Sequence, residues 1–237
     1  MGAVCDLILI RHEEAEGNAA MVRSKFSGDD SKFTEILRTT PSNDWRLTDF
    51  GKERCVKLRG WIMNNVPLAN GFRFVTSPSM RSIETANLIL PEAVWSTEEL
   101  VRGRTWGGIE SIPWSEWPQF CKVKHHNALP SGFLQAYPGG ETMAEVWKRT
   151  IRFINTLESN TLAITHGEVM LMAQMVIESV PTSQYKPIEM GSNHISNGHV
   201  LWYSKQSPLT GICFDHFTFR RLAFDNTDTG WSTFTHS

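Results

Sequence analysis

The chain has 237 residues, a length that suits one well-cored domain and is marginal for two. Hydrophobic residues make up 41% and charged residues 20%, which argues against a disordered chain, and a net charge of −2 without a basic block argues against a nucleic-acid partner. The apolar run Leu7–Ile10 is too short to span a bilayer, so we expect no membrane segment. Scattered cysteines without a C-x-x-C pair predict reduced thiols in a cytoplasmic protein without a zinc site; they are Cys5, Cys55, Cys121 and Cys213.

Strand and helix patterns alternate along the first half of the chain. Asp6–Arg11 is typical of a strand, and a helix is expected to begin within Glu14–Asn18. A second helix begins after Thr48, and its apolar face is predicted to comprise Val56, Leu58, Trp61, Ile62 and Val66. The next elements expected are a strand at Phe72–Ser77, a helix at Met80–Leu90 and a strand at Ala93–Thr97.

The second half continues the alternation. A capping-box pattern at Thr142 opens a helix expected to reach about Glu158. It is followed by expected elements at Thr161–Thr165 (strand), Glu168–Val180 (helix), Val200–Ser204 (strand) and Cys213–Arg220 (strand). Alternating strands and helices predict an α/β fold over residues 1–237, a single three-layer domain with a mainly parallel sheet and helices on both faces. Irregular insertions are expected near residues 27–45 and 106–138, as substrate walls or as surface additions.

Arginine and histidine follow three of the predicted strands. Arg11 and His12 end the first strand, Arg81 opens the helix after the second, and His166 follows the strand Thr161–Thr165. Because ligands bind beyond the carboxyl ends of parallel strands, we expect these side chains to meet at one edge of the sheet. Helix N-termini nearby also favour anions. The sequence therefore predicts an anion pocket at this edge.

Five segments spread over most of the chain carry motifs of one known family, in its order. LIRHEEAEGN is similar to R-H-G-E-x-x-x-N, LTDFGKERC to L-T-x-x-G, SPSMRSIETA to S-x-x-x-R-x-x-[EQ]-T-A, YPGGET to P-x-G-E-[ST], and ITHGEV to a second-histidine motif. Together they resemble the histidine phosphatase superfamily, also called the phosphoglycerate mutase-like family. The resemblance implies the phosphoglycerate mutase-like fold.

The resemblance also assigns roles. It implies that His12 is a nucleophile that forms a phosphohistidine, as a neutral imidazole can near pH 7. Arg11, Arg81 and His166 would bind the phosphoryl oxygens, with no metal and no cofactor. Further substrate contacts implied by the motifs are Asn18, Ser27, Gly28 and Gly167.

The proton donor can be aligned in two ways. In one, Glu99 begins an E-x-x-x-G-x-x-x-G pattern and supplies the acid, which is the assignment we predict. In the other, R-G-R-T-W-G matches a family R-E-R-x-W-G segment, and Gly103 falls where the glutamate is expected. Glu110 or Glu13 then remains as a substitute.

The predicted function is that of a phosphomonoesterase of the histidine acid phosphatase type, acting on a small phosphorylated metabolite. A cofactor-dependent phosphoglycerate mutase or related phosphotransferase is the first alternative, although its R-H-Y-G-x-x-x-G-x-x-K and R-x-x-D-x-P-P-P segments are not found. The second alternative is a non-catalytic phospho-ligand binder. The substrate and a homo-oligomeric state are left open.

Glu13 stands where the family signature has glycine. We expect its side chain to face solvent, with an arginine partner or a cationic part of the substrate as alternatives. Arg81 has the alternative of pairing with Glu84, three residues away on its helix. Glu141 is expected to fix the turn before its helix.

Two features of the second insertion have alternative interpretations. Adjacent His125 and His126 are expected to be solvated or to line the substrate site rather than to bind a metal. A tryptophan-rich segment either walls the substrate or packs on its own core; it contains Trp106, Trp114 and Trp117.

Overall fold

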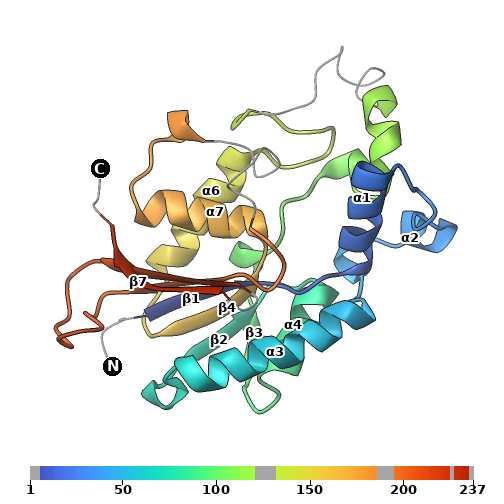
Figure 1. Ribbon diagram of the computed structural model, residues 1–237. Helices are drawn as coiled ribbons and strands as arrows, with labels where there is room; N and C mark the ends of the chain where they lie inside the picture. Colours follow the sequence, from blue (N-terminus) through green and yellow to red (C-terminus); the bar gives the residue numbers. More distant parts are fainter. Residues whose placement is uncertain (1–5, 121–131, 186–194, 225–226, 235–237) are drawn as a thin grey trace.

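One seven-stranded sheet organises the fold (Figure 1). The computed structural model of the chain describes residues 6–120, 132–185, 195–224 and 227–234. The strands are β1 (Asp6–Arg11), β2 (Arg73–Thr76), β3 (Trp95–Thr97), β4 (Thr161–Thr165), β5 (Val200–Ser204), β6 (Phe219–Phe224) and β7 (Thr227–Thr233). They run in the order β3-β2-β4-β1-β5-β6-β7; the first four are parallel, and β5, β6 and β7 are antiparallel additions. The α/β class with a parallel centre is therefore confirmed.

Helices cover both faces of the sheet. They are α1 (Glu16–Ser27), α2 (Glu35–Thr39), α3 (Asp49–Asn65), α4 (Met80–Ile89), α6 (Met143–Asn155) and α7 (Gly167–Ile177). In Figure 1, α6 and α7 lie on one face, α3 and α4 on the other, and α1 and α2 beyond the end of the sheet. Alternation along β1 explains the two cores, because Leu7 and Leu9 pack in the α6–α7 layer whereas Ile8 and Ile10 pack in the α3–α4 layer.

Local sequence sets several helix boundaries. The Thr48 hydroxyl accepts a hydrogen bond from the Gly51 amide at 3.0 Å and so caps α3. The capping box at Thr142 is present, since its hydroxyl accepts from the Glu145 amide at 3.1 Å while Glu145 reaches back to the Thr142 amide at 2.8 Å. The helix it opens, α6, ends at Asn155, before the predicted Glu158.

Four details of the predicted elements are wrong. Strand β6 begins at Phe219 rather than Cys213, because only from Phe219 does the chain pair with β5, and β7 was not predicted at all. On α3, Val56 is 69% exposed and Cys55 occupies the buried face instead. Finally, α7 ends at Ile177, and Ser179 beyond it has a positive φ of 55°, which is incompatible with a continuing helix.

Both insertions carry structure of their own. Residues 27–45 contain α2 and the 3₁₀ helix η1 (Ser42–Asp44). The tryptophan-rich segment packs on its own core, a cluster next to α1 formed by Ile109, Trp117 and Tyr137, with Met21, Trp106, Ile112, Trp114 and Phe120 around it. His125 and His126 lie outside the described residues.

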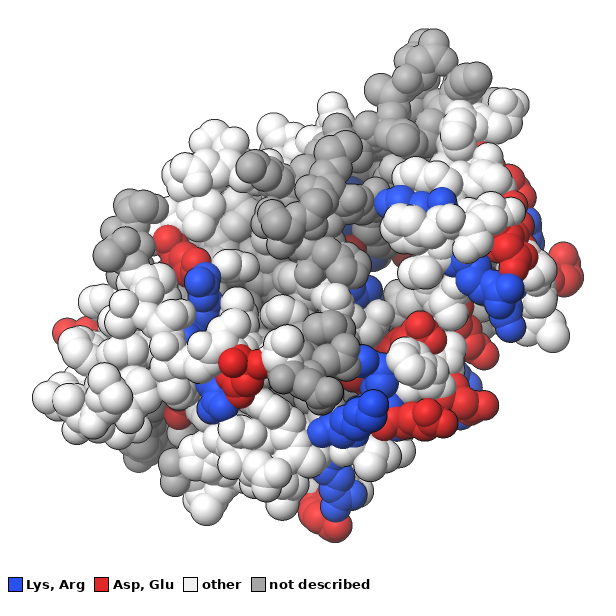
Figure 2. Space-filling model, viewed as in Figure 1, with Lys and Arg blue, Asp and Glu red and all other residues white. Residues whose placement is uncertain are grey.

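Charges are interspersed on the surface. Figure 2 shows basic and acidic side chains side by side over the α1–α3 side of the face in view. Salt bridges account for part of this pattern, for example Lys52 with Asp49 on α3 at 2.9 Å. Within the described ranges, no helix is long and apolar enough to cross a membrane.

Candidate active site

Two histidines and an arginine meet beyond the carboxyl ends of the parallel strands. The rings of His12 and His166 lie edge to face with their centroids 4.9 Å apart. The Arg81 Nε donates a hydrogen bond to His12 Nε2 at 3.1 Å, and Arg81 Nη2 lies 3.5 Å from His166 Nδ1. Both histidines are only 3% exposed. The guanidinium group thus bridges two buried imidazoles.

The sheet topology produces this meeting. Strands β1 and β4 are parallel neighbours with Arg11 opposite Thr165, so the next residue of each, His12 and His166, emerges at the same level. The His12 amide extends the pairing by donating to the Thr165 carbonyl at 2.9 Å. Arg81 arrives from the first turn of α4, which follows β2 on the other side of β4.

Hydrogen bonds fix the proton of His12 on one nitrogen. Its Nδ1 lies 2.7 Å from the Glu13 carbonyl oxygen, which can only accept, so Nδ1 carries the hydrogen and Nε2 a lone pair. Burial and the charges of Arg81 and Arg11 lower the pKa of His12 well below its ordinary value. The ring is therefore neutral at pH 7, and the nucleophilic lone pair of Nε2 accepts the hydrogen bond from Arg81.

His166 is held from its other side. Its Nε2 lies 2.8 Å from the hydroxyl oxygen of Ser77 and 3.5 Å from that of Ser79. Burial and the charge of Arg81 lower the pKa of His166 well below its ordinary value, so it is also neutral. The two serines were not predicted; the signal for them was the S-P-S sequence at residues 77–79, two positions before Arg81.

Arg11 presents an unused donor. One end of its guanidinium group donates to the Ile195 carbonyl oxygen, whereas its Nε is buried and has no hydrogen-bond partner. Burial lowers the pKa of Arg11, and the charge of Glu168 opposes that effect. A β-carbon at Gly167 would lie 3.7 Å from the Arg11 side chain, so Gly167 borders the same group. An unpaired buried donor of this kind is a suitable partner for an anionic oxygen.

Asn18 lies close behind the nucleophile. Its Oδ1 accepts from the Ala15 amide at 3.1 Å and lies 3.3 Å from the Asn197 amide nitrogen. Asn197, which was not predicted, also donates to the His12 carbonyl oxygen at 2.9 Å. Asn18 therefore belongs to the hydrogen-bond network around His12.

The structure does not bring Ser27 and Gly28 to this cluster. Helix α1 continues to Ser27, about 13 Å along the axis from Asn18 at 1.5 Å per residue. Gly28 terminates the helix with φ 65°, and both residues are exposed. Where the resemblance implied a turn, this chain has the last turn of α1 and its C-cap.

The predicted acid, Glu99, also lies outside the histidine cluster. Glu99 lies in the 3₁₀ helix η3 (Glu99–Val101), where it is exposed, and no contact among the described residues joins its side chain to either histidine. In contrast, a β-carbon built on Gly103 would lie 3.0 Å from His166 Nδ1. Residue 103 is therefore the one at the wall of the cluster. Glu110 is connected to it indirectly: its carboxylate accepts from the Ser42 hydroxyl at 2.9 Å, and the Ser42 carbonyl accepts from Arg81 at 2.6 Å.

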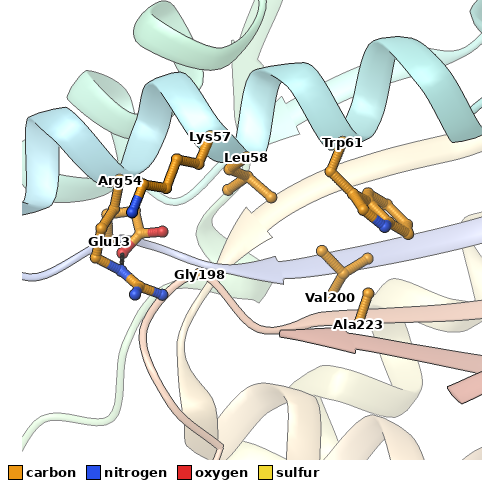
Figure 3. A pocket seen from close by; sticks show the side chains of 8 residues that line it. All are labelled: Glu13, Arg54, Lys57, Leu58, Trp61, Gly198, Val200 and Ala223. Carbon is orange, nitrogen blue, oxygen red and sulfur yellow. Dashed lines mark hydrogen bonds and ion pairs between the residues drawn. The ribbon is translucent and has the colours of Figure 1, made fainter. Parts of the chain in front are cut away.

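Glu13 does not face solvent, so that prediction is wrong. Its side chain is 2% exposed and pairs with Arg54 through a 2.9 Å contact between Oε2 and Nε (Figure 3). The pair lies at one end of a pocket under α3 that continues past Leu58 and Trp61. The carboxylate at the substituted position is therefore paired with Arg54, while the Glu13 backbone carbonyl orients the imidazole of His12.

Two other acidic residues have structural partners. Glu84 pairs with Arg46 at 2.6 Å and not with Arg81, which excludes the helical pair considered above. Glu141 accepts two 2.7 Å hydrogen bonds from Arg102 and lies 3.3 Å from the Nε of Arg149. Burial alone would raise the pKa of Glu141, but Arg102 and Arg149 hold it below its ordinary value.

Within the described chain, no group of three or more histidine, cysteine or acidic residues is arranged to hold a metal ion.

The comparison with protein families agrees with this geometry. The model of the histidine phosphatase superfamily (branch 1) matches residues 7–209. The chain belongs to this superfamily. A sequence comparison with curated proteins found no match.

Solved structures of the superfamily fold resemble the chain at low identity. A mycobacterial hydrolase 1 has a TM-score of 0.64 at 15% identity, over 95% of this chain and 100% of its own. The YhfR protein of Bacillus stearothermophilus has a TM-score of 0.64 at 19% identity, over 88% of this chain and 94% of its own. A mycobacterial glucosyl-3-phosphoglycerate phosphatase complexed with VO3 has a TM-score of 0.60 at 15% identity, over 85% and 93% respectively. At these identities the likeness concerns the fold alone.

Proposed function

We propose that the protein is a phosphatase that hydrolyses a small phosphorylated metabolite through a phosphohistidine on His12. The observation that carries the proposal is the buried contact between the neutral His12 Nε2 and the Arg81 guanidinium group at 3.1 Å. A lone pair next to a cation is the arrangement that an incoming phosphoryl group needs, since its phosphorus is attacked while its oxygens are neutralised. Membership of the superfamily supports the proposal, as does the phosphatase activity named for one structural neighbour.

The proposed reaction has two steps. A phosphate monoester enters between His12 and Arg81, and its oxygens accept hydrogen bonds from Arg81 and from the free Nε of Arg11. His12 Nε2 attacks phosphorus, the bond to the leaving oxygen breaks, and that oxygen keeps the electron pair. Water then attacks the phosphohistidine, the P–N bond breaks, and neutral His12 and dihydrogen phosphate are released. His12 keeps the hydrogen on Nδ1 throughout, held by the Glu13 carbonyl.

An assay with para-nitrophenyl phosphate tests the proposal directly. The wild-type protein and a His216→Ala control, which changes an exposed histidine, are expected to release phosphate at similar rates. His12→Ala is expected to lose turnover and the acid-labile phosphoryl label that ³²P-substrate leaves on the wild type.

A non-catalytic phospho-ligand binder would give another result. The glycine at position 103 is the observation that favours it, because the cluster wall there carries no acid. Phosphate binding that requires His12, without turnover or labelling of any substrate, would replace the phosphatase with the binder. Phosphoryl exchange between two metabolites that outpaces hydrolysis would indicate a mutase or phosphotransferase.

A further inference from the structure

Gly103 is fixed at the edge of His166 that faces Arg81. A β-carbon there would lie 3.0 Å from His166 Nδ1, the nitrogen that is 3.5 Å from Arg81 Nη2. The backbone is held in place because the Gly103 carbonyl accepts from Arg102 at 3.1 Å and from Arg149 at 3.3 Å. Glu141 in turn pairs with both of these arginines. The hydrogen-bonded segment thus presents the backbone of Gly103 to the cluster. A side chain at residue 103 would start at the wall of the pocket.

The basicity of the leaving oxygen determines whether the missing side chain at residue 103 affects the reaction rate. An alkyl phosphate expels an alkoxide, a strongly basic anion that requires a proton from a positioned acid, and such an acid contributes about 10²–10⁴-fold to the rate. A leaving group that is stable as an anion departs without that proton. The carboxylates around the cluster therefore decide which substrates are cleaved.

Each nearby carboxylate is already engaged. Glu141 holds its two arginines, and Glu13 pairs with Arg54 under α3. The two oxygens of Glu110 accept from the Ser42 hydroxyl and from the Trp106 amide, each at 2.9 Å.

Glu168, in the first turn of α7, is the remaining acidic neighbour of the cluster among the described residues. Its charge attracts both Arg11 and Arg81. Its carboxylate thus faces two cationic partners, Arg11 and Arg81.

Resting on the proposed phosphatase activity, we propose that the enzyme acts on phosphoryl groups whose leaving group departs as a stable anion: acyl phosphates, phosphoanhydrides or phenolic phosphates. Gly103 is the residue that determines this specificity, by leaving the pocket wall without an acid. In the transfer step His12 Nε2 bonds to phosphorus, the P–O bond breaks, and the carboxylate, phosphate or phenolate leaves with the electron pair. Alkyl esters such as glycerol phosphate are poor substrates because their alkoxide has no proton source.

Wild-type rates on a series of leaving groups test the proposal without any substitution. With substituted phenyl phosphates, acetyl phosphate and glycerol 3-phosphate, kcat/KM is expected to fall steeply as the leaving-group pKa rises. The alkyl ester is expected to be at least about 10³-fold slower than para-nitrophenyl phosphate, within the range attributed to a missing acid. Comparable rates on the alkyl and phenolic esters would overturn the proposal, and loss of only the alkyl rate in Glu110→Gln or Glu168→Gln would identify the acid that does so.

Matched variants test the role of residue 103. Gly103→Glu is expected to raise the ratio of alkyl to para-nitrophenyl turnover at least tenfold over Gly103→Ala, which introduces the same close approach to His166 without a carboxyl group. An unchanged ratio in a folded Gly103→Glu protein would refute the assignment to residue 103. If the proposed phosphatase activity itself is wrong, the result is different: no substrate of the series turns over or labels His12. That outcome would refute the specificity proposal together with the phosphatase activity.

Discussion

The buried ion pair between Glu13 and Arg54 makes a strong prediction about stability. The charged atoms lie 2.9 Å apart, and the side chains are 2% and 13% exposed. Replacing Arg54 with methionine keeps much of the side-chain volume but leaves the Glu13 carboxylate buried without that partner. It also removes the hydrogen bond from Arg54 Nη2 to the Asn197 carbonyl at 3.2 Å.

Removing one member of a buried pair costs about 3–5 kcal/mol, whereas an exposed pair contributes about 0.2–1 kcal/mol. We therefore expect Arg54→Met to lower the free energy of unfolding by about 3–5 kcal/mol. With a urea m-value of about 3 kcal/mol/M, the unfolding midpoint falls by about 1–1.7 M. The double variant Glu13→Gln with Arg54→Met should recover most of this loss, because no uncompensated charge remains.

Urea unfolding followed by tryptophan fluorescence measures these differences. Lys52→Met is the matched control, since Lys52 also lies on α3 and pairs with Asp49 at the surface, with 51% and 94% of the two side chains exposed. An Arg54→Met midpoint within error of the Lys52→Met midpoint would refute the reasoning. Glu13→Gln alone should keep kcat/KM within about tenfold of wild type even if it is less stable, because the carbonyl that orients His12 belongs to the backbone.

Three further predictions concern the cluster and the insertion. Arg81→Ala should lower kcat/KM for para-nitrophenyl phosphate by about 10²–10³-fold, the usual effect of removing one transition-state donor. The control Arg46→Ala should leave kcat/KM unchanged, because Arg46 is 63% exposed and pairs with Glu84. Burial lowers the pKa of both His12 and His166 in the folded state, so the unfolded chain binds more protons as the pH falls through about 6.5. Stability should therefore fall by about 1 kcal/mol for each histidine between pH 6.5 and 5.5, and by about 1.4 kcal/mol per pH unit further below. Urea titrations at pH 6.5 and 5.5 should show this loss in wild type and not in a His12→Asn, His166→Asn double variant. Trp117→Ala should lower the free energy of unfolding by about 3–5 kcal/mol with little change in KM, because Trp117 is 5% exposed within the aromatic cluster. Thermal or urea unfolding measures the loss, and a large rise in KM would show instead that Trp117 lines the substrate site.

The location of the cluster was predictable from sequence because it follows from topology. Alternating elements implied a parallel sheet, and parallel strands place their carboxyl ends at one edge. Arg11, His12 and His166 each sit within one residue of such an end, and Arg81 opens the helix that follows one, so chain position alone was enough to bring them together. The structure adds the pairing geometry that fixes the tautomer of His12.

Side-chain partners distant in sequence were not predictable in this way. A charged residue next to a strand is ordinarily expected at the surface, yet Glu13 finds Arg54, 41 positions away, under α3. Ser27 and Gly28 show the converse: a short motif does not reveal that α1 continues to Ser27 and carries both residues away from Asn18. The boundary of β6 depended likewise on its pairing with β5 and not on its own apolar residues.

The two alignments around position 99 show what structure contributes to motif reasoning. One matched the glycine spacing E-x-x-x-G-x-x-x-G from Glu99, and the other matched R-E-R-x-W-G with Gly103 in place of the glutamate. Only the second is compatible with how the segment is anchored. Arg102 and Arg149 grip the Gly103 carbonyl while Glu141 holds both arginines, which fixes residue 103, and not Glu99, beside His166. Arg102, Arg149 and Glu141 of the P-G-G-E segment form one brace around Gly103. The joint presence of these three residues, rather than glycine spacing, is the signal that sets the register. With that register, the absence of a carboxyl group at residue 103 is a property of the pocket and not an error of alignment.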